Sequence, residues 1–131
     1  MESRHLAVVI RRDPAAVAGF ARAHLAEWAA GLAAGDPRPD PADPAVLVVD
    51  SPMGEVRVRF APPNDLGVLD HAVTLSDGGV VRNPLRVLPH PHGAEVVFTL
   101  RHLDGVTDEA FEADAAAVRA DLDRLRALLG P

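Results

Sequence analysis

Four residue types are missing from this 131-residue chain: cysteine, tyrosine, glutamine and lysine. Without cysteine it has no disulfide, no thiol nucleophile and no thiolate metal ligand. Without lysine it has no Schiff-base amine and no phosphate-loop lysine, and without tyrosine it has no phenolic acid. Any catalysis must therefore use histidine, aspartate, glutamate, arginine, asparagine or a bound cofactor.

Long apolar runs and basic clusters are also missing. No stretch approaches the roughly 20 apolar residues that a membrane span needs, and the first residues do not resemble a secretory signal. The net charge of −6 argues against a nucleic-acid partner. We therefore expect one domain over residues 1–131, located in the cytoplasm and without membrane insertion. These features do not determine the oligomeric state.

The clearest pattern present is a set of apolar residues spaced alternately by four and three: Phe111, Ala115, Val118, Leu122, Leu125 and Leu129. This spacing predicts one long helix of about six turns. Thr107 is its expected N-cap, and Asp108 and Glu109 in the first turn suit the positive end of the helix dipole.

Two shorter helices are expected near the start of the chain. Asp13 can accept a hydrogen bond from a free amide as N-cap, and Pro14 loses no helical hydrogen bond at the first position. The apolar spacing indicates helices at about 14–22 and 24–32, or one helix bent near His24.

Glycine and proline mark the end of this helical region. Gly31 and Gly35 are the expected stop signals. Residues 36–44 carry four prolines, which fix φ and remove backbone donors. We expect a stiff, exposed loop there.

Most of the remaining chain alternates apolar and polar residues, which predicts antiparallel strands. Together with the short apolar run at 6–12, six strands are expected: 6–12, 46–49, 56–60, 68–75, 80–88 and 94–103. A hairpin around Asp77-Gly78-Gly79 is expected to pair Leu75 with Val81 and Val73 with Asn83.

The order strand, two helices, strands and one long helix predicts an α+β fold, in which a small sheet wraps round the C-terminal helix and leaves an apolar cavity. Five segments also resemble the START-like (SRPBCC) superfamily, which includes polyketide cyclase/dehydrase and lipid-transport proteins. They are Asp13-Pro14 with Val17 and Phe20, Trp28-Ala29-Ala30-Gly31-Leu32, Gly67-Val68-Leu69-Asp70-His71, Asn83-Pro84-Leu85-Arg86-Val87, and Glu95-Val96-Val97-Phe98-Thr99-Leu100 leading to Asp108-Glu109-Ala110-Phe111.

This resemblance covers nearly the whole chain and is closest to small uncharacterised bacterial members. It implies a helix-grip fold, a curved antiparallel sheet of seven strands that grips the C-terminal helix round a hydrophobic cavity. Six strands are clear here, so we expect six to seven.

His71 and Asn83 are the most informative polar residues. Neighbours on a strand point to opposite faces, so His71 shares the apolar face with Leu69, and Asn83 is expected on the same face, diagonal to His71. The two side chains either satisfy each other in the core, directly or through a water, or contact a ligand. A third alternative makes His71 a proton carrier, and it is the one catalytic candidate. Asp70 points outward and is expected to pair with Arg86.

The aromatic side chains are few and are expected in the core, where some also form pocket walls. Trp28 and Phe98 are the best candidates for flat contact with a ligand. The complete set of predicted ligand-binding residues is His71, Asn83, Trp28, Phe60, Phe98, Phe111, Leu69 and Leu85.

His90-Pro91-His92 places two imidazoles close together, but no third ligand lies at a metal-site spacing. We expect a solvent-exposed turn and no metal site. His102 ends the inward-facing series of its strand, either at the cavity rim or at an exposed strand end. No nucleotide or other cofactor is expected, because the glycine-rich pieces lack the strand-glycine-helix context.

Three functions are compatible with these patterns. The first is binding of an apolar or amphipathic small molecule between the sheet and the C-terminal helix, with His71 and Asn83 orienting one polar group. The second is a polyketide cyclase- or dehydratase-like enzyme that uses the same cavity. The third is a non-enzymatic interaction protein with a filled core.

Overall fold

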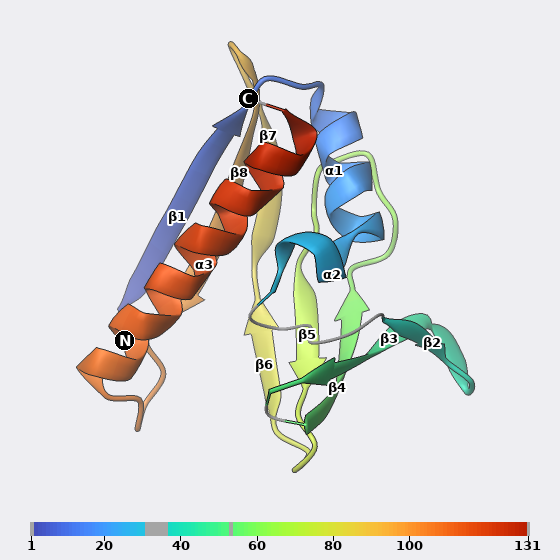
Figure 1. Ribbon diagram of the computed structural model, residues 1–131, viewed down its shortest axis with the longest axis vertical. Helices are drawn as coiled ribbons and strands as arrows, with labels where there is room; N and C mark the ends of the chain where they lie inside the picture. Colours follow the sequence, from blue (N-terminus) through green and yellow to red (C-terminus); the bar gives the residue numbers. More distant parts are fainter. Residues whose placement is uncertain (1, 31–36, 53, 131) are drawn as a thin grey trace.

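The computed structural model describes residues 2–30, 37–52 and 54–130. The long C-terminal helix crosses one face of the strands, and two short helices cover the space beside it (Figure 1). The elements in chain order are β1 (Ser3–Ile10), α1 (Pro14–Ala23), α2 (Leu25–Trp28), β2 (Arg38–Asp40), β3 (Asp43–Ser51), β4 (Gly54–Phe60), β5 (His71–Thr74), β6 (Val80–Asn83), β7 (Leu85–His90), β8 (Gly93–Arg101) and α3 (Asp108–Leu129). Within the described residues, no helix combines the length and the apolar character needed to cross a bilayer.

The helix starts agree with the sequence. Asp13 caps α1 by accepting a hydrogen bond from the Ala15 amide at 3.1 Å. Thr107 caps α3 by accepting from the Ala110 amide at 3.1 Å. The predicted end of the second short helix was wrong, because α2 ends at Trp28. Gly31 and Gly35 lie outside the described residues.

The strands form two antiparallel ladders, β1-β8-β7 and β2-β3-β4-β5-β6. They part at Pro84, which has no amide hydrogen to donate and divides the predicted strand 80–88 into β6 and β7. Residues just before β5 bridge the gap, because the Leu69 amide donates to the Leu85 carbonyl at 2.9 Å and the Val87 amide donates to the Gly67 carbonyl at 2.8 Å. The two ladders therefore form one strongly bent surface.

The hairpin between β5 and β6 has a different register from the predicted one. His71 lies directly opposite Asn83. Val73 lies opposite Val81 rather than Asn83, a slip of two residues. The hairpin is tighter because the Leu75 amide bonds to the Gly79 carbonyl at 2.8 Å. A slip of two keeps every side chain on its expected face.

The proline-rich segment was predicted as a loop, and this was wrong for its described part. Arg38–Asp40 forms the edge strand β2, which pairs with β3. An edge strand tolerates proline because one side of its backbone needs no ladder partner. This strand and the division at Pro84 bring the described strands to eight.

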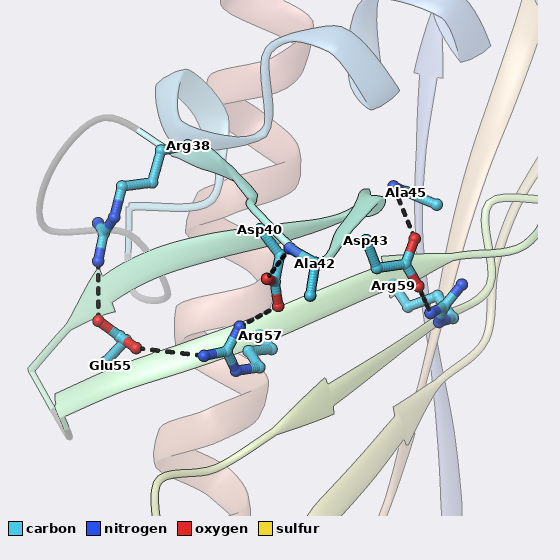
Figure 2. A network of polar contacts seen from close by, with 8 residues as sticks. All are labelled: Arg38, Asp40, Ala42, Asp43, Ala45, Glu55, Arg57 and Arg59. Carbon is cyan, nitrogen blue, oxygen red and sulfur yellow. Dashed lines mark hydrogen bonds and ion pairs between the residues drawn. The ribbon is translucent and has the colours of Figure 1, made fainter.

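Ion pairs hold the hairpin formed by β2 and β3 over the outer face of β4 (Figure 2). Asp40 pairs with Arg57, and Asp43 pairs with Arg59. The two arginines therefore face outward as expected, but they carry partners. Val46 and Val48 share this outer face and remain 8% and 3% exposed.

The core lies between the helices and the inner face of the bent sheet. α3 packs against β1 and β8, and α1 packs against β7 and β8. The largest fully buried side chains are Ile10, Val17, Val49, Val56, Val58, Leu85, Val87, Val96, Leu122 and Leu125. They come from strands of both ladders and from two helices. One shared core therefore packs against both ladders and holds the sheet in its bent shape.

Candidate functional site

A hollow of about 220 Å³ lies between α2, α3 and the inner face of β5, β6 and β8. It is the space that the sequence predicts between sheet and C-terminal helix. Its apolar walls are Leu25, Trp28, Ala29, Phe98, Leu100, Ala117 and Val118. The polar residues on its surface are His71, Asn83, Asp114 and Asp121. We call this space the inner hollow.

His71 is the one buried polar or charged residue among the described residues, with 7% exposure. Its Nδ1 lies 3.0 Å from the Leu69 carbonyl oxygen. A carbonyl can only accept, so Nδ1 carries the hydrogen and Nε2 of the neutral ring is left as an acceptor. The rings of Phe60 and Phe98 lie beside the imidazole, with centroids 5.3 Å and 6.2 Å away.

The environment of His71 favours this neutral form. Burial lowers the pKa of His71 below 6.5, and this effect outweighs the opposing hydrogen bond to Leu69 and the charge of Asp70. Desolvation penalises the imidazolium because its charge would lose most of its water. At neutral pH the inner hollow is therefore bordered by a neutral imidazole.

Asn83, on β6, is half-buried and lies opposite His71 of β5. A direct hydrogen bond between these two residues, one of the alternatives from the sequence, is not formed, and His71 Nδ1 contacts the Leu69 carbonyl just before β5. The Asn83 side chain has no hydrogen-bond partner among the described residues. Its amide, with two donors and one acceptor, is free to bind a ligand.

Trp28 forms the opposite wall. Its indole nitrogen donates to the Ala21 carbonyl at 2.9 Å, so the ring has a fixed orientation. Arg124 on α3 donates to the Trp28 carbonyl at 2.7 Å and to Asp121 at 2.9 Å. These bonds fasten α2 to α3 on the helical side of the inner hollow.

The eight predicted ligand-binding residues do not all meet in one place. His71, Asn83, Trp28 and Phe98 line the inner hollow. Phe60 lies behind His71, under the guanidinium of Arg22, and Leu69 borders a separate groove. Leu85 is fully buried in the core. The ring of Phe111 stacks on His102, and the guanidinium of Arg4 lies over the same ring.

The inner hollow also contains residues that were not predicted as ligand contacts. Leu25, Leu100 and Val118 belong to apolar series that the sequence displays. Asp114, Ala117 and Asp121 form a second stripe on α3, beside the apolar one. Their spacing of three and four was the available signal.

A larger groove of about 620 Å³ runs between α1 and residues 63–69. Its lining includes Pro14, Ala15, Ala18 and Gly19, and its arginine, Arg22, donates to the Ala61 carbonyl at 2.7 Å. The groove contains no histidine. The inner hollow is the better candidate for function because apolar walls and two polar groups converge there.

Three other histidines make structural contacts away from the inner hollow. His90 and His92 flank the turn between β7 and β8, and the His92 amide donates to His90 Nδ1 at 3.0 Å. His102 Nε2 lies 2.6 Å from the Val106 carbonyl, away from the inner hollow. In the described ranges, no group of three or more histidine or acidic side chains is arranged to hold a metal.

Comparison of the sequence with known families and curated proteins finds no match. The structure is similar to several solved structures. The protein XoxI from Bacillus cereus matches with a TM-score of 0.74 and 14% identity, over 98% of this chain and 96% of that chain. A protein from Chromobacterium violaceum matches with a TM-score of 0.67 and 15% identity, over 100% and 99% of the two chains.

Ara h 8.0201 matches with a TM-score of 0.66 and 10% identity, over 98% of this chain and 97% of that chain. At these identities the similarities establish the fold alone. Antiparallel strands bent round a long C-terminal helix, shared over nearly the full length of these proteins, confirm that the chain has a helix-grip fold.

Proposed function

We propose that this protein is a START-like (SRPBCC) domain, active in the cytoplasm, that binds an apolar or amphipathic small molecule in the inner hollow. The observation that carries the proposal is the convergence of Trp28, Phe98, His71 and Asn83 on one space between sheet and helices. Apolar walls with a few polar groups are the usual composition of a ligand site.

The size of the inner hollow limits the ligand. Its volume of about 220 Å³ lies below the roughly 300–1,000 Å³ of drug-sized sites. Each 100 Å² of apolar ligand surface removed from water contributes about 2.5 kcal/mol, against the cost of immobilising the ligand. We therefore expect a short acyl chain or a single ring rather than a long lipid.

The fluorescence of Trp28 provides a direct test, because the chain has one tryptophan and no tyrosine. Titration with octan-1-ol should produce a saturable change in the emission of Trp28. Native mass spectrometry of freshly purified protein should show a retained small molecule. No saturable change together with no retained mass would contradict the proposal and favour the filled-core interaction protein.

A matched pair of variants locates the binding. Ala117 and its neighbour Ala116 are both exposed, but Ala117 lines the inner hollow and Ala116 does not. Ala117→Phe should fill the space and weaken octan-1-ol binding at least about tenfold, whereas Ala116→Phe should leave it unchanged. Equal affinity of the two variants would place the ligand elsewhere.

The enzyme alternative is supported by the orientation of His71. A neutral imidazole with its hydrogen on Nδ1 presents a basic Nε2, the form that a general base requires. A β-hydroxyacyl N-acetylcysteamine thioester is a suitable probe for loss of water. Turnover that disappears in His71→Asn, with octan-1-ol binding retained, would support catalysis. Absence of turnover in the unmodified protein would leave binding as the function.

A further inference from the structure

A second hollow, of about 540 Å³, lies on the outer side of the bent sheet. It opens where β6 and β8 diverge. β6 is the last strand of its ladder among the described residues. The pairing of β7 with β8 ends at Leu85 opposite Phe98, and one further bond follows it, from the Thr99 amide to the Pro84 carbonyl at 3.0 Å. The backbone edges of β6 and of the end of β8 therefore flank an opening in the sheet. We call this space the outer hollow.

Three arginines border the outer hollow: Arg59 at the end of β4, Arg82 on β6 and Arg101 at the end of β8. Arg59 is paired with Asp43. Arg101 donates to Ser3 Oγ at 2.9 Å, which is a neutral acceptor. Arg82 has no hydrogen bond or ion pair with any described residue. Arg82 and Arg101 therefore line this space without a carboxylate partner among the described residues.

The acidic residue of the same wall does not cancel these charges. Asp70 borders the outer hollow, but both of its oxygens are bonded to Arg86. This surplus of positive charge occurs in a chain whose net charge is −6. Guanidinium groups bind carboxylates through two parallel hydrogen bonds, so the outer hollow is suited to an anionic group.

His71 and Asn83 border both hollows. They lie opposite each other at the level where the sheet opens, and the side-chain amide of Asn83 has no partner in the part of the chain that the structure describes. On the helical side, the inner hollow is bordered by Asp114, which has no ion pair with a described residue and repels an anion, and by Asp121, which is paired with Arg124. An amphipathic acid in the inner hollow is therefore most stable with its charged end toward Asn83 and the arginines.

We propose that the ligand of this protein is a small carboxylic acid, with its apolar part in the inner hollow and its carboxylate held by Arg82 and Arg101 in the outer hollow. Asn83 donates from its amide to the carboxylate where it passes between the two spaces. This inference rests on the proposed function, since it assigns a chemical class to the ligand of the inner hollow.

The test compares octanoate with octan-1-ol, which has the same chain and no charge, by Trp28 fluorescence at low ionic strength. In the unmodified protein octanoate should bind about tenfold more tightly than the alcohol. The double variant Arg82→Ala/Arg101→Ala should lower octanoate affinity to that of the alcohol and leave the alcohol unaffected. Both arginines are exposed, so the fold should be retained.

The matched control is Arg11→Ala/Arg126→Ala, which removes the same charge from exposed positions that border neither hollow. Arg11 follows the far end of β1, about 26 Å along the strand from Ser3. This control should keep the preference for octanoate. Loss of the preference in the control would show that net charge alone is responsible and would overturn the inference.

The outcomes separate this inference from the function on which it rests. Binding of octan-1-ol that equals binding of octanoate in the unmodified protein would overturn the carboxylate assignment and leave the apolar site intact. Binding of neither probe would contradict both. Octyl phosphate serves as a third probe, and tighter binding of it than of octanoate would replace the carboxylate with a phosphate.

Discussion

Asp70 holds Arg86 through two parallel hydrogen bonds, from Nε to Oδ1 at 2.8 Å and from Nη2 to Oδ2 at 2.7 Å. The same Oδ1 accepts from the Leu85 amide at 2.9 Å. One carboxylate therefore fastens the segment before β5 to the start of β7, at the place where the sheet bends after Pro84. The ion pair expected from the sequence is confirmed, and it also satisfies a backbone amide that no strand partner reaches.

Asp70→Asn should destabilise the protein by about 1 kcal/mol at neutral pH, at the lower end for charged hydrogen bonds because the pair is partly exposed. The bonds from Arg86 lower the pKa of Asp70 below 3.8, so the stabilisation is present above about pH 4 and is lost as pH falls through the lower folded value. Urea unfolding at neutral and acidic pH measures this difference.

The matched control for that change is Asp65→Asn, because Asp65 is exposed and has no partner among the described residues. It should alter the free energy of unfolding by less than about 0.5 kcal/mol at either pH. An Asp70→Asn variant with the same free energy of unfolding as this control would show that the ion pair at the bend does not stabilise the protein.

His71 should make the protein less stable in mild acid. Burial lowers its folded pKa below the unfolded value of 6.5, so between these two values the unfolded chain binds more protons. The free energy of unfolding should therefore fall as pH decreases below about 6.5, until the folded pKa is passed. In His71→Asn this contribution should disappear, as measured by urea unfolding between pH 5 and pH 8.

His92→Asn serves as the control, because His92 lies in an exposed turn. It should retain the full pH dependence of the unmodified protein. An NMR titration of His71 gives an independent reading, and a His71 pKa at or above 6.5 would contradict the burial argument.

Asn64 holds the loop between β4 and β5 with all the bonds that one amide can make. Its Nδ2 donates to the carbonyls of Pro62 and Val68, each at 2.9 Å. Its Oδ1 accepts from the amides of Leu66 and Val68, at 2.9 Å and 3.1 Å. Asn64→Ala should cost about 1–2 kcal/mol and should speed amide exchange at Leu66 and Val68.

Asn64→Asp is a sharper form of this test. It keeps the acceptor and turns the two donors into an anion facing carbonyl oxygens, so it should destabilise more than Asn64→Ala at neutral pH. Thermal unfolding of the two variants gives the order. The opposite order would show that the donor bonds to Pro62 and Val68 do not matter.

Gly67, in the same loop, is expected to be less replaceable than Gly78 in the turn between β5 and β6. It has φ of +74°, and an added Cβ would lie 2.0 Å from the Val87 carbonyl oxygen. Gly78 has φ of +90° with open space round it. Gly78→Ala should therefore cost about 1–2 kcal/mol for its backbone conformation alone, and Gly67→Ala clearly more. Urea unfolding compares the two, and equal losses would contradict the steric argument.

Local signals in the sequence were sufficient for α1, for α3 and for the position of the inner hollow, but not for the end of α2. Thr107 and the spacing from Phe111 to Leu129 predict α3, because a cap and a 3.6-residue period depend only on near neighbours. The alternation along 68–75 placed His71 on the inner face, and the predicted hairpin pairing placed Asn83 on the same face. Their role as ligand contacts, with that of Trp28 and Phe98, stays a prediction.

Long-range geometry was not predictable in the same way. The register of the β5–β6 hairpin depends on whether Leu75 closes on Gly79 or Val81, and both choices keep the same faces. The strand β2 exists because β3 supplies a partner, a tertiary effect that overrides the local preference of proline. Phe111 lies outside the lining of the inner hollow, because apolar spacing does not show which part of α3 reaches beyond the cavity.

The proline-rich edge strand affects how copies of this protein meet one another. Among the residues that the structure describes, β2 ends one ladder, and Pro39 in its middle has no amide hydrogen to donate to an approaching strand. An exposed edge of this kind would otherwise invite a neighbouring molecule to extend the sheet. A residue that weakens β2 as a strand thus protects the concentrated protein against strand-to-strand aggregation.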